Sequence, residues 1–293
     1  MSSRYDMGRS WESRMRRTEG PGVFFSLAAI LGLAGCMASP VHLNPGAVDG
    51  RDGGGPTPNY AMLMRIGAAA RSGGDLPNAV GIYRRAADMA PQEPAPLIAA
   101  GDVLLQMGAV NEAIVSYNQA LVRPGDTQRA QIGLAKAFLK TGKPELAQAP
   151  LSRALEGDPN DPKLALLQGV TNDLAGRHWE AQANYRDGLG RAPGDPALTL
   201  DLALSLTLSG DYPTAIAVLQ PLAMAPTSSP QERQTLALIY GLRGNVAEAA
   251  RLGRIDLDDG AVQHNLAYYQ TLRELSPEAR SRAILSGSPA RAS

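Results

Sequence analysis

The sequence contains few of the residues that metal, disulfide and nucleic-acid chemistry require. It has one cysteine, Cys36, and three histidines that lie far apart, so it can form no internal disulfide and shows no zinc-ligand motif. Its 28 basic and 28 acidic residues balance, and no basic stripe indicates nucleic-acid binding. Aromatic residues make up only 5% of the chain, and Ala and Leu supply most of the apolar content. This composition predicts an all-α fold.

Motifs of catalysis are also missing from the sequence. It shows no phosphate loop, nucleophile elbow or zinc-protease motif. The neighbouring carboxylates Asp258 and Asp259 fall where a helix is expected to begin, so we interpret them as caps. We expect His178 and Trp179 to pack structurally in a turn region, although an exposed Trp there would be a contact point. The sequence therefore predicts a protein that is not an enzyme, with no cofactor, no metal and no small-molecule substrate.

No hydrophobic run is long enough to cross a bilayer, which takes about 20 apolar residues. The longest run, Val23 to Gly35, has the length of the apolar region of a signal peptide and follows Arg14, Arg16 and Arg17. We therefore predict that residues 1–35 are an export signal.

The run ends in LAGC (33–36), which resembles the lipobox of bacterial lipoproteins. The resemblance implies that the mature chain starts at Cys36, with a diacylglyceryl thioether on the sulfur and an acylated amino terminus. It also implies an outer-membrane, periplasm-facing location, because Met37 replaces the Asp that accompanies inner-membrane retention. Several acyl chains on one residue would give stable anchoring. The alternative is an inert cysteine buried in a short helix.

Residues 36–58 are rich in Gly and Pro and show no periodicity. This composition predicts a flexible tether whose span is on the order of 25 Å. A folded body attached to it would lie clear of the lipid surface.

The remainder of the chain is built on a repeat of 34 residues. Six short phrases recur at that interval, each with a glycine at its start and an alanine at its end: GDLPNA (74–79), GAVNEA (108–113), GKPELA (142–147), GRHWEA (176–181), GDYPTA (210–215) and GNVAEA (244–249). A strict 34-residue period is the signature of tetratricopeptide (TPR) repeats, with two antiparallel helices in each unit. The prediction for residues 59–258 is a right-handed TPR solenoid of six helix-turn-helix units.

The residue types within the units agree with this prediction. The six glycines suit left-handed ends of the first helices. Small residues face each other across each hairpin, at Ala79 and its equivalents and, on the first helix, at Gly67, Gly101, Ala135, Gly169, Ala203 and Ala237. Larger residues follow in the next layer, at Tyr83, Tyr117, Leu151, Tyr185 and Leu219. The usual Trp position of the first helix is filled by other residues, which affects the packing rather than the fold.

Two segments follow the repeats. Residues 259–275 show apolar side chains at helical spacing, which predicts a helix that caps the solenoid behind Asp259. Residues 276–293 contain charged and small residues, and we expect a disordered tail there.

The first helices of a TPR solenoid line its concave face, which makes them candidates for partner binding. Repeat arithmetic places these residues on that face: Met64, Ala68, Arg71, Ile98, Asp102, Leu105, Ile132, Lys136, Leu139, Leu166, Val170 and Asp173. The set is mostly apolar with isolated charges, which suits an amphipathic helix or an extended segment of a partner protein. The alternative for each residue is packing between adjacent helices.

The C-terminal segment carries a more specific resemblance. An export signal of the lipoprotein type, six TPR units, and RIDLDDGAVQHNLAYYQTLREL (254–275) followed by RSRAILSG (280–287) resemble the TadD-type lipoproteins of the tight-adherence (Tad/Flp) pilus assembly system. The resemblance implies a pilotin-like, non-enzymatic role in which the protein holds the outer-membrane secretin or a companion assembly lipoprotein. The alternatives are a general envelope scaffold, serving outer-membrane protein insertion or cell-wall enzymes, and an enzyme, which a convergent cluster of Ser, His or carboxylate groups would indicate.

Overall fold

The computed structural model describes residues 59–125 and 127–286. Within these residues the chain forms fourteen helices, α2 to α15, and no strand. The predicted signal, Cys36 and the predicted tether all lie outside the described residues. No helix in the described part of the chain is long and apolar enough to span a membrane.

Twelve of the helices form six antiparallel pairs in the predicted 34-residue register. The first helices are α2 (Tyr60–Ser72), α4 (Ala95–Gln106), α6 (Gln128–Lys140), α8 (Pro162–Leu174), α10 (Pro196–Leu208) and α12 (Pro230–Arg243). The second helices are α3 (Leu76–Met89), α5 (Val110–Leu121), α7 (Pro144–Gly157), α9 (His178–Arg191), α11 (Tyr212–Ala223) and α13 (Val246–Gly253). The predicted all-helical repeat fold is confirmed.

The turn inside each pair is a left-handed glycine turn. The six predicted glycines have φ between 68° and 94°, a region that favours glycine because it lacks a Cβ. In every unit the residue after the glycine donates its N–H to the carbonyl five residues earlier, over 2.8 to 3.1 Å. This bond satisfies a carbonyl that the end of the first helix leaves free. The repeated phrases therefore set the hairpin geometry of each unit.

In the first five units, the size of the residue in the tyrosine layer matches the small residue opposite it on the first helix. Tyr rings lie directly against glycines of the first helix in three units, where an added Cβ would stand only 2.6 Å (Gly67–Tyr83), 2.7 Å (Gly101–Tyr117) and 2.2 Å (Gly169–Tyr185) from the ring. The two units with the smaller Leu151 and Leu219 in this layer carry Ala135 and Ala203 instead. A glycine faces the larger tyrosine and an alanine faces the smaller leucine, so the combined volume of the two facing side chains stays nearly constant.

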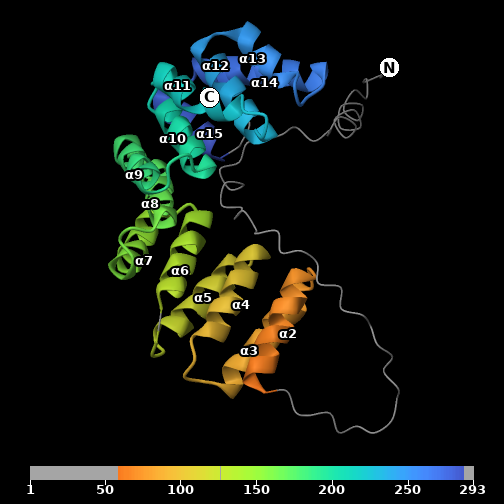
Figure 1. Cartoon of the computed structure of the whole chain (residues 1–293), viewed down its shortest axis with the longest axis vertical. Coiled ribbons are helices and arrows are strands. Elements are labelled where there is room, and N and C mark those ends of the chain that lie inside the picture. The colour runs from red at the N-terminus through yellow and green to blue at the C-terminus, as the bar shows by residue number, and fades with distance from the viewer. Residues whose placement is uncertain (1–58, 126, 287–293) are drawn as a thin grey trace, which may run out of the picture.

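The pairs follow one another along an arc, with α2, α4, α6 and α8 on its inner side (Figure 1). Neighbouring first helices contact each other (α4 with α6, α8 with α10, α10 with α12) more extensively than neighbouring second helices do in the described residues. This difference places the first helices on the tighter side of the curve. We call the surface formed by α2, α4, α6 and α8 the inner face.

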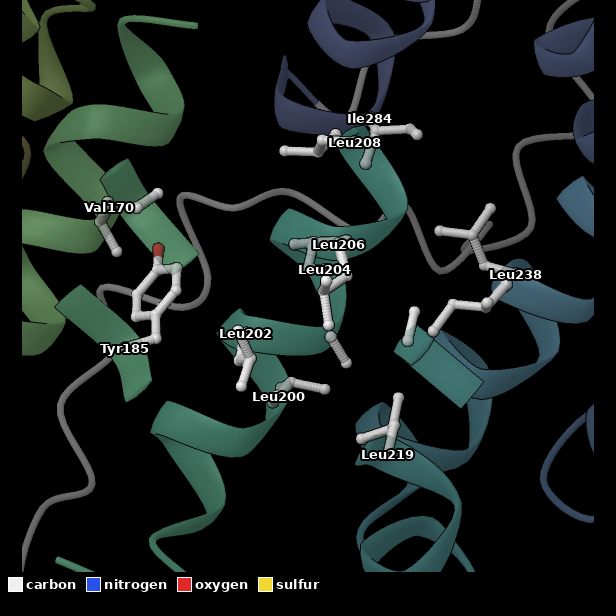
Figure 2. Close-up of a cluster of buried hydrophobic side chains, with 14 of the residues drawn as sticks. Val170, Tyr185, Leu200, Leu202, Leu204, Leu206, Leu208, Leu219, Leu238 and Ile284 are labelled. Atoms are coloured by element: carbon white, nitrogen blue, oxygen red, sulfur yellow. The ribbon is translucent and has the colours of Figure 1, made fainter. Parts of the chain in front are cut away.

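Helix α10 is enclosed, unlike the other first helices. Every residue from Leu200 to Leu208 is buried, and its leucines join an apolar cluster with side chains of neighbouring helices (Figure 2). Its leucines accordingly fall on every side of the helix, and its polar residues Asp201, Ser205 and Thr207 are buried among them.

Helix α14 (Asp259–Glu274) occupies the place predicted for the cap and packs against α12 and α13. Its N-cap is Asp258, whose side chain accepts from the N–H of Ala261 at 2.8 Å, so the predicted cap at Asp259 was wrong by one residue. The ring of Tyr269 lies against Gly241 of α12, where an added Cβ would be 2.3 Å away. This helix repeats the glycine–tyrosine contact of the solenoid at its end.

The expectation of a disordered tail from Ser276 was wrong for residues 277–286. These residues form α15 (Pro277–Ser286), in which Ser281, Ala283 and Ile284 are buried against the solenoid. Ten residues with two buried aliphatic side chains give almost no periodic signal, and a helix this short depends on tertiary contacts. Residues 287–293 lie outside the described residues.

Candidate functional site

The structure separates the twelve predicted concave-face residues into two groups. Seven remain partly or fully accessible: Met64, Ala68, Arg71, Asp102, Ile132, Lys136 and Leu166. Five are buried: Ile98, Leu105, Leu139, Val170 and Asp173. The buried residues pack between helices, as the alternative interpretation of the sequence allowed. Only the accessible residues can contact a partner in this conformation.

A cluster of charged side chains surrounds Asp102 on the inner face. Its Oδ1 accepts from the hydroxyl of Tyr117 at 2.9 Å, and its Oδ2 accepts from Nη2 of Arg129 at 3.1 Å. Nη1 of Arg71 forms an ion pair with the same Oδ2 at 3.9 Å. The cluster therefore joins three consecutive helix pairs through one carboxylate.

Packing of the tyrosine ring positions this cluster. The ring of Tyr117 lies between Gly101 of α4 and Gly133 of α6, where added Cβ atoms would stand 2.7 and 2.3 Å from it. Burial, followed by the neighbouring charge of Asp102, raises the pKa of Tyr117 above its ordinary value of 10, so the phenol stays neutral and donates. Two glycines in adjacent units thus allow the hydroxyl to reach Asp102.

Lys136 adds a further positive group to the same face. It is half-buried, and burial lowers its pKa, an effect that Asp102 opposes and Lys163 reinforces. We define Arg71, Asp102, Tyr117, Arg129 and Lys136 as the inner-face cluster. It has three basic side chains and one carboxylate. The accessible side chains of Met64 and Ile132 lie on two of the same helices, α2 and α6, and Leu166 lies on the next first helix, α8.

Two members of the cluster, Tyr117 and Arg129, are not among the twelve residues predicted for the concave face. Arg129 occupies the second position of its unit, which the repeat arithmetic also assigns to the concave face, so the signal was present. Tyr117 was assigned to the packing layer, and no pattern in the sequence indicates that its hydroxyl reaches the inner face. The structure thus gives this face a net positive character that isolated charges did not indicate.

A second polar cluster is buried where α8, α9 and α10 meet. Asp173 Oδ1 lies 2.8 Å from Nδ1 of His178 and accepts from Oγ of Ser205 at 2.7 Å, and Oδ2 accepts from the hydroxyl of Tyr185 at 3.0 Å. Burial raises the pKa of Asp173, and its hydrogen bonds with His178, Ser205 and Tyr185 oppose that shift. Asp173 therefore ties three helices together and does not line a binding surface.

This cluster contains the residue types of a hydrolase but not the required arrangement. Nucleophilic catalysis needs a serine hydroxyl bonded to an imidazole that can accept its proton. Ser205 instead donates to Asp173 and to the carbonyl of His178, and its side chain is fully buried. The geometry is that of a buried hydrogen-bond network.

Two further residues that the sequence singles out, His178 and Trp179, differ in their surroundings. His178 is largely buried through its bond to Asp173, whereas Trp179 is 72% exposed, so the expected packing of that ring was wrong. Among residues 59–125 and 127–286, no group of three or more His, Cys, Asp or Glu side chains is placed to hold a metal ion.

The architecture defines a helical repeat protein with an accessible, positively charged inner face. A family model described as tetratricopeptide repeat matches residues 50–94, 98–162 and 175–229, which together exceed half of the chain. The chain belongs to the tetratricopeptide repeat family.

Curated relatives share part of this repeat sequence. "Cellulose synthase operon protein C" of Xanthomonas axonopodis pv. citri (strain 306) is 28% identical over 188 residues, which are 61% of this chain and 12% of that protein. "Cellulose synthase 1 operon protein C" of Komagataeibacter xylinus is 29% identical over 155 residues, which are 52% of this chain and 12% of that one. The chain thus spans about an eighth of the length of these relatives.

Solved structures share the fold at low identity. A structure described as the functional characterization of Pseudomonas aeruginosa pilF matches with a TM-score of 0.58 and 16% identity, over 71% of this chain and 96% of that one. A tetratricopeptide repeat protein from Parabacteroides merdae ATCC 43184 matches with a TM-score of 0.58 and 16% identity, over 72% and 84% of the two chains. These similarities show the fold alone.

Proposed function

We propose that this protein is an outer-membrane-anchored scaffold for tight-adherence pilus assembly that holds a secretin or a companion assembly protein on its inner face. The observation that carries the proposal is the accessible inner-face cluster on a TPR solenoid. TPR proteins bind protein partners, and here the first helices present cations beside aliphatic surface.

In this proposal, membrane anchoring and partner binding are performed by different parts of the chain. Lipid on Cys36 would fix the protein to the membrane, and residues 37–58 would let the solenoid reach its partner. Tethering raises the effective concentration of the partner at the face, so modest affinity for each segment suffices. The pilus assignment is supported by the resemblance of residues 254–287 to TadD-type lipoproteins.

The inner-face cluster favours a partner segment that carries carboxylates as well as apolar groups. Arg129 is extended into solvent, with a side chain 67% exposed, and shares Asp102 with Arg71. A carboxylate of the partner could replace Asp102 at either guanidinium, which can bind it through two hydrogen bonds. This chemistry differs from the mainly apolar face that the sequence predicts.

A second candidate function is a scaffold for polysaccharide synthesis or export in the envelope. The observation that favours it is the sequence similarity to the cellulose synthase operon C proteins. It is a specific form of the general envelope scaffold that the sequence also allows.

The two candidates are distinguished by affinity capture of the full-length protein from detergent-solubilised membranes. The wild-type protein is compared with Arg129→Glu/Lys136→Glu and with Arg153→Glu/Arg186→Glu, which makes the same change of charge on exposed positions of second helices. We expect the wild type and the second variant to retain the pilus secretin and the inner-face variant to lose it. Equal capture by both variants would contradict the binding face, and capture of polysaccharide export components would support the second candidate.

A further inference from the structure

The ninth position of each unit changes character along the inner side of the solenoid. Its residues are Ala68, Asp102, Lys136, Val170, Leu204 and Leu238. The first three are accessible and the last three are buried. Leucine at a position on the inner side requires a cover, because an exposed row of leucines would favour association with other molecules.

Helix α15 covers part of this apolar region. Ile284 belongs to the same apolar cluster as Leu204, Leu208 and Leu238, and Figure 2 shows its side chain beside Leu208 at the end of α10. Oγ of Ser281 lies 3.4 Å from the carbonyl of Leu208, at the limit of a hydrogen bond. The helix therefore lies against the side of the solenoid, whereas α14 packs on its last pair.

One arginine makes most of the polar contacts of α15. Nε of Arg280 donates to the carbonyl of Leu272 at 2.8 Å, and Nη2 donates to the carbonyl of Leu275 at 3.1 Å, both near the C-terminal end of α14. Nη1 donates to the hydroxyl of Tyr212 at 2.8 Å. A guanidinium suits this place because carbonyls at a helix C-terminus carry partial negative charge.

The contact is narrow for a permanent part of the core. Three residues of α15 are buried, Ser281, Ala283 and Ile284, and the link to α14 is two residues long. An isolated helix of ten residues is unstable in water, so α15 is ordered only while it is docked. Departure of α15 would also return the carbonyls at the end of α14 to water, where they are hydrated.

We propose that the surface formed by the end of α10, Tyr212 and the C-terminal end of α14 is a second docking site, and that α15 is its exchangeable resident. Its external ligand is an amphipathic helix of a partner protein that presents an arginine and, one turn later, a branched aliphatic residue. The spacing is that of Arg280 and Ile284, four residues apart on one face of a helix. This site is separate from the inner-face cluster and does not depend on the pilus assignment.

The test uses the full-length protein in detergent and a fluorescent peptide of residues 275–286. In the wild type α15 competes with the peptide, and the apparent affinity falls in proportion to the open fraction. The Arg280→Ala/Ile284→Ala protein should therefore bind the peptide at least about tenfold more tightly than the wild type. Arg282→Ala is the control, because Arg282 is exposed on the same helix, and it should behave as the wild type.

A variant peptide and amide hydrogen exchange test the specificity of the site and the opening of α15. A peptide with the same two substitutions should bind neither protein, which shows that the arginine and the isoleucine are the determinants. In the unmodified protein, backbone amides of α15 should exchange with solvent at least about tenfold faster than those of α14. Equal exchange in α14 and α15, loss of cooperative melting in the variant, or absence of peptide binding would each overturn the proposal.

Discussion

The ring of Tyr83 lies so close to Gly67 that a Cβ on the glycine would stand 2.6 Å from the ring carbon Cε1. The same contact recurs between Gly101 and Tyr117. Because the tyrosine ring occupies the space that a methyl group on residue 67 would need, a tyrosine at position 83 requires a glycine at position 67. In these pairs the contact limits how closely the two helices can approach.

We expect Gly67→Ala to lower the free energy of unfolding by about 1–3 kcal/mol, because the added methyl overlaps a buried ring. Chemical denaturation of the variant and the wild type measures this change. The control is Gly81→Ala on α3, where nothing lies within 4 Å of an added Cβ. That substitution should stabilise the protein by about 0.5–1 kcal/mol, because alanine has the higher helix propensity.

The double variant Gly67→Ala/Tyr83→Leu should be more stable than the sum of the single changes by about 1 kcal/mol or more, because the two residues touch. It recreates the Ala and Leu combination that two other units carry naturally. Additive effects in the double-mutant cycle would show that the two positions do not compensate for each other.

Asp201 gives the protein a pH-dependent stability. The side chain is 2% exposed, and neither carboxyl oxygen has a hydrogen-bond partner among the described residues. Burial, and then the charges of Asp173 and Asp195, raise its pKa from 3.8 to about 8. The folded protein therefore holds a proton that the unfolded chain releases above about pH 4, and stability falls as the pH rises from about 4 to about 8.

Asp201→Asn should remove this loss, so the variant should exceed the wild type by a few kcal/mol near pH 8 and match it more closely near pH 4. Urea denaturation across this range measures the difference. Asp88→Asn, which changes an exposed carboxylate on α3, serves as the control. A wild-type stability that rises between pH 5 and 8 while that of the Asp201→Asn protein stays flat would refute the assignment.

Burial decides which predicted inner-face residues can be altered without unfolding the protein. Leu139→Glu should cost several kcal/mol, because it places an unpaired charge at a position only 4% exposed. Arg129→Glu should cost about 1 kcal/mol or less, because its ion pair is largely solvated. Thermal melting of the two proteins compares them directly, and similar losses would contradict the separation of buried from accessible positions.

Cys36→Ser should release the protein from the membrane without changing the melting temperature of the solenoid, since the lipid and the repeats are separate parts of the chain. Fractionation followed by immunoblotting measures the distribution. If the variant still sediments with the outer membrane, the protein is held there by something other than the proposed lipid.

The sequence was sufficient for the repeat architecture because the signal recurs six times. The turn glycines from Gly74 to Gly244 recur at one constant interval, so the boundaries of all six helix pairs can be predicted without knowledge of long-range contacts. The inner face was predicted less well, because the repeat position alone does not say whether a neighbour covers the residue. Asp102 and Asp173 were both assigned to that face, yet only Asp102 is accessible. Helix α15 was missed because its stability comes from contacts with α10 and α14.

Site-specific photo-crosslinking in intact cells shows directly whether the inner face holds the partner. A photoreactive residue replaces Ala68, which is exposed on the inner face, or Ala183, which is exposed on the second helix α9. We expect a crosslink to the pilus secretin or its companion protein from position 68 and none from position 183. A crosslink to that partner from position 183 alone would contradict it.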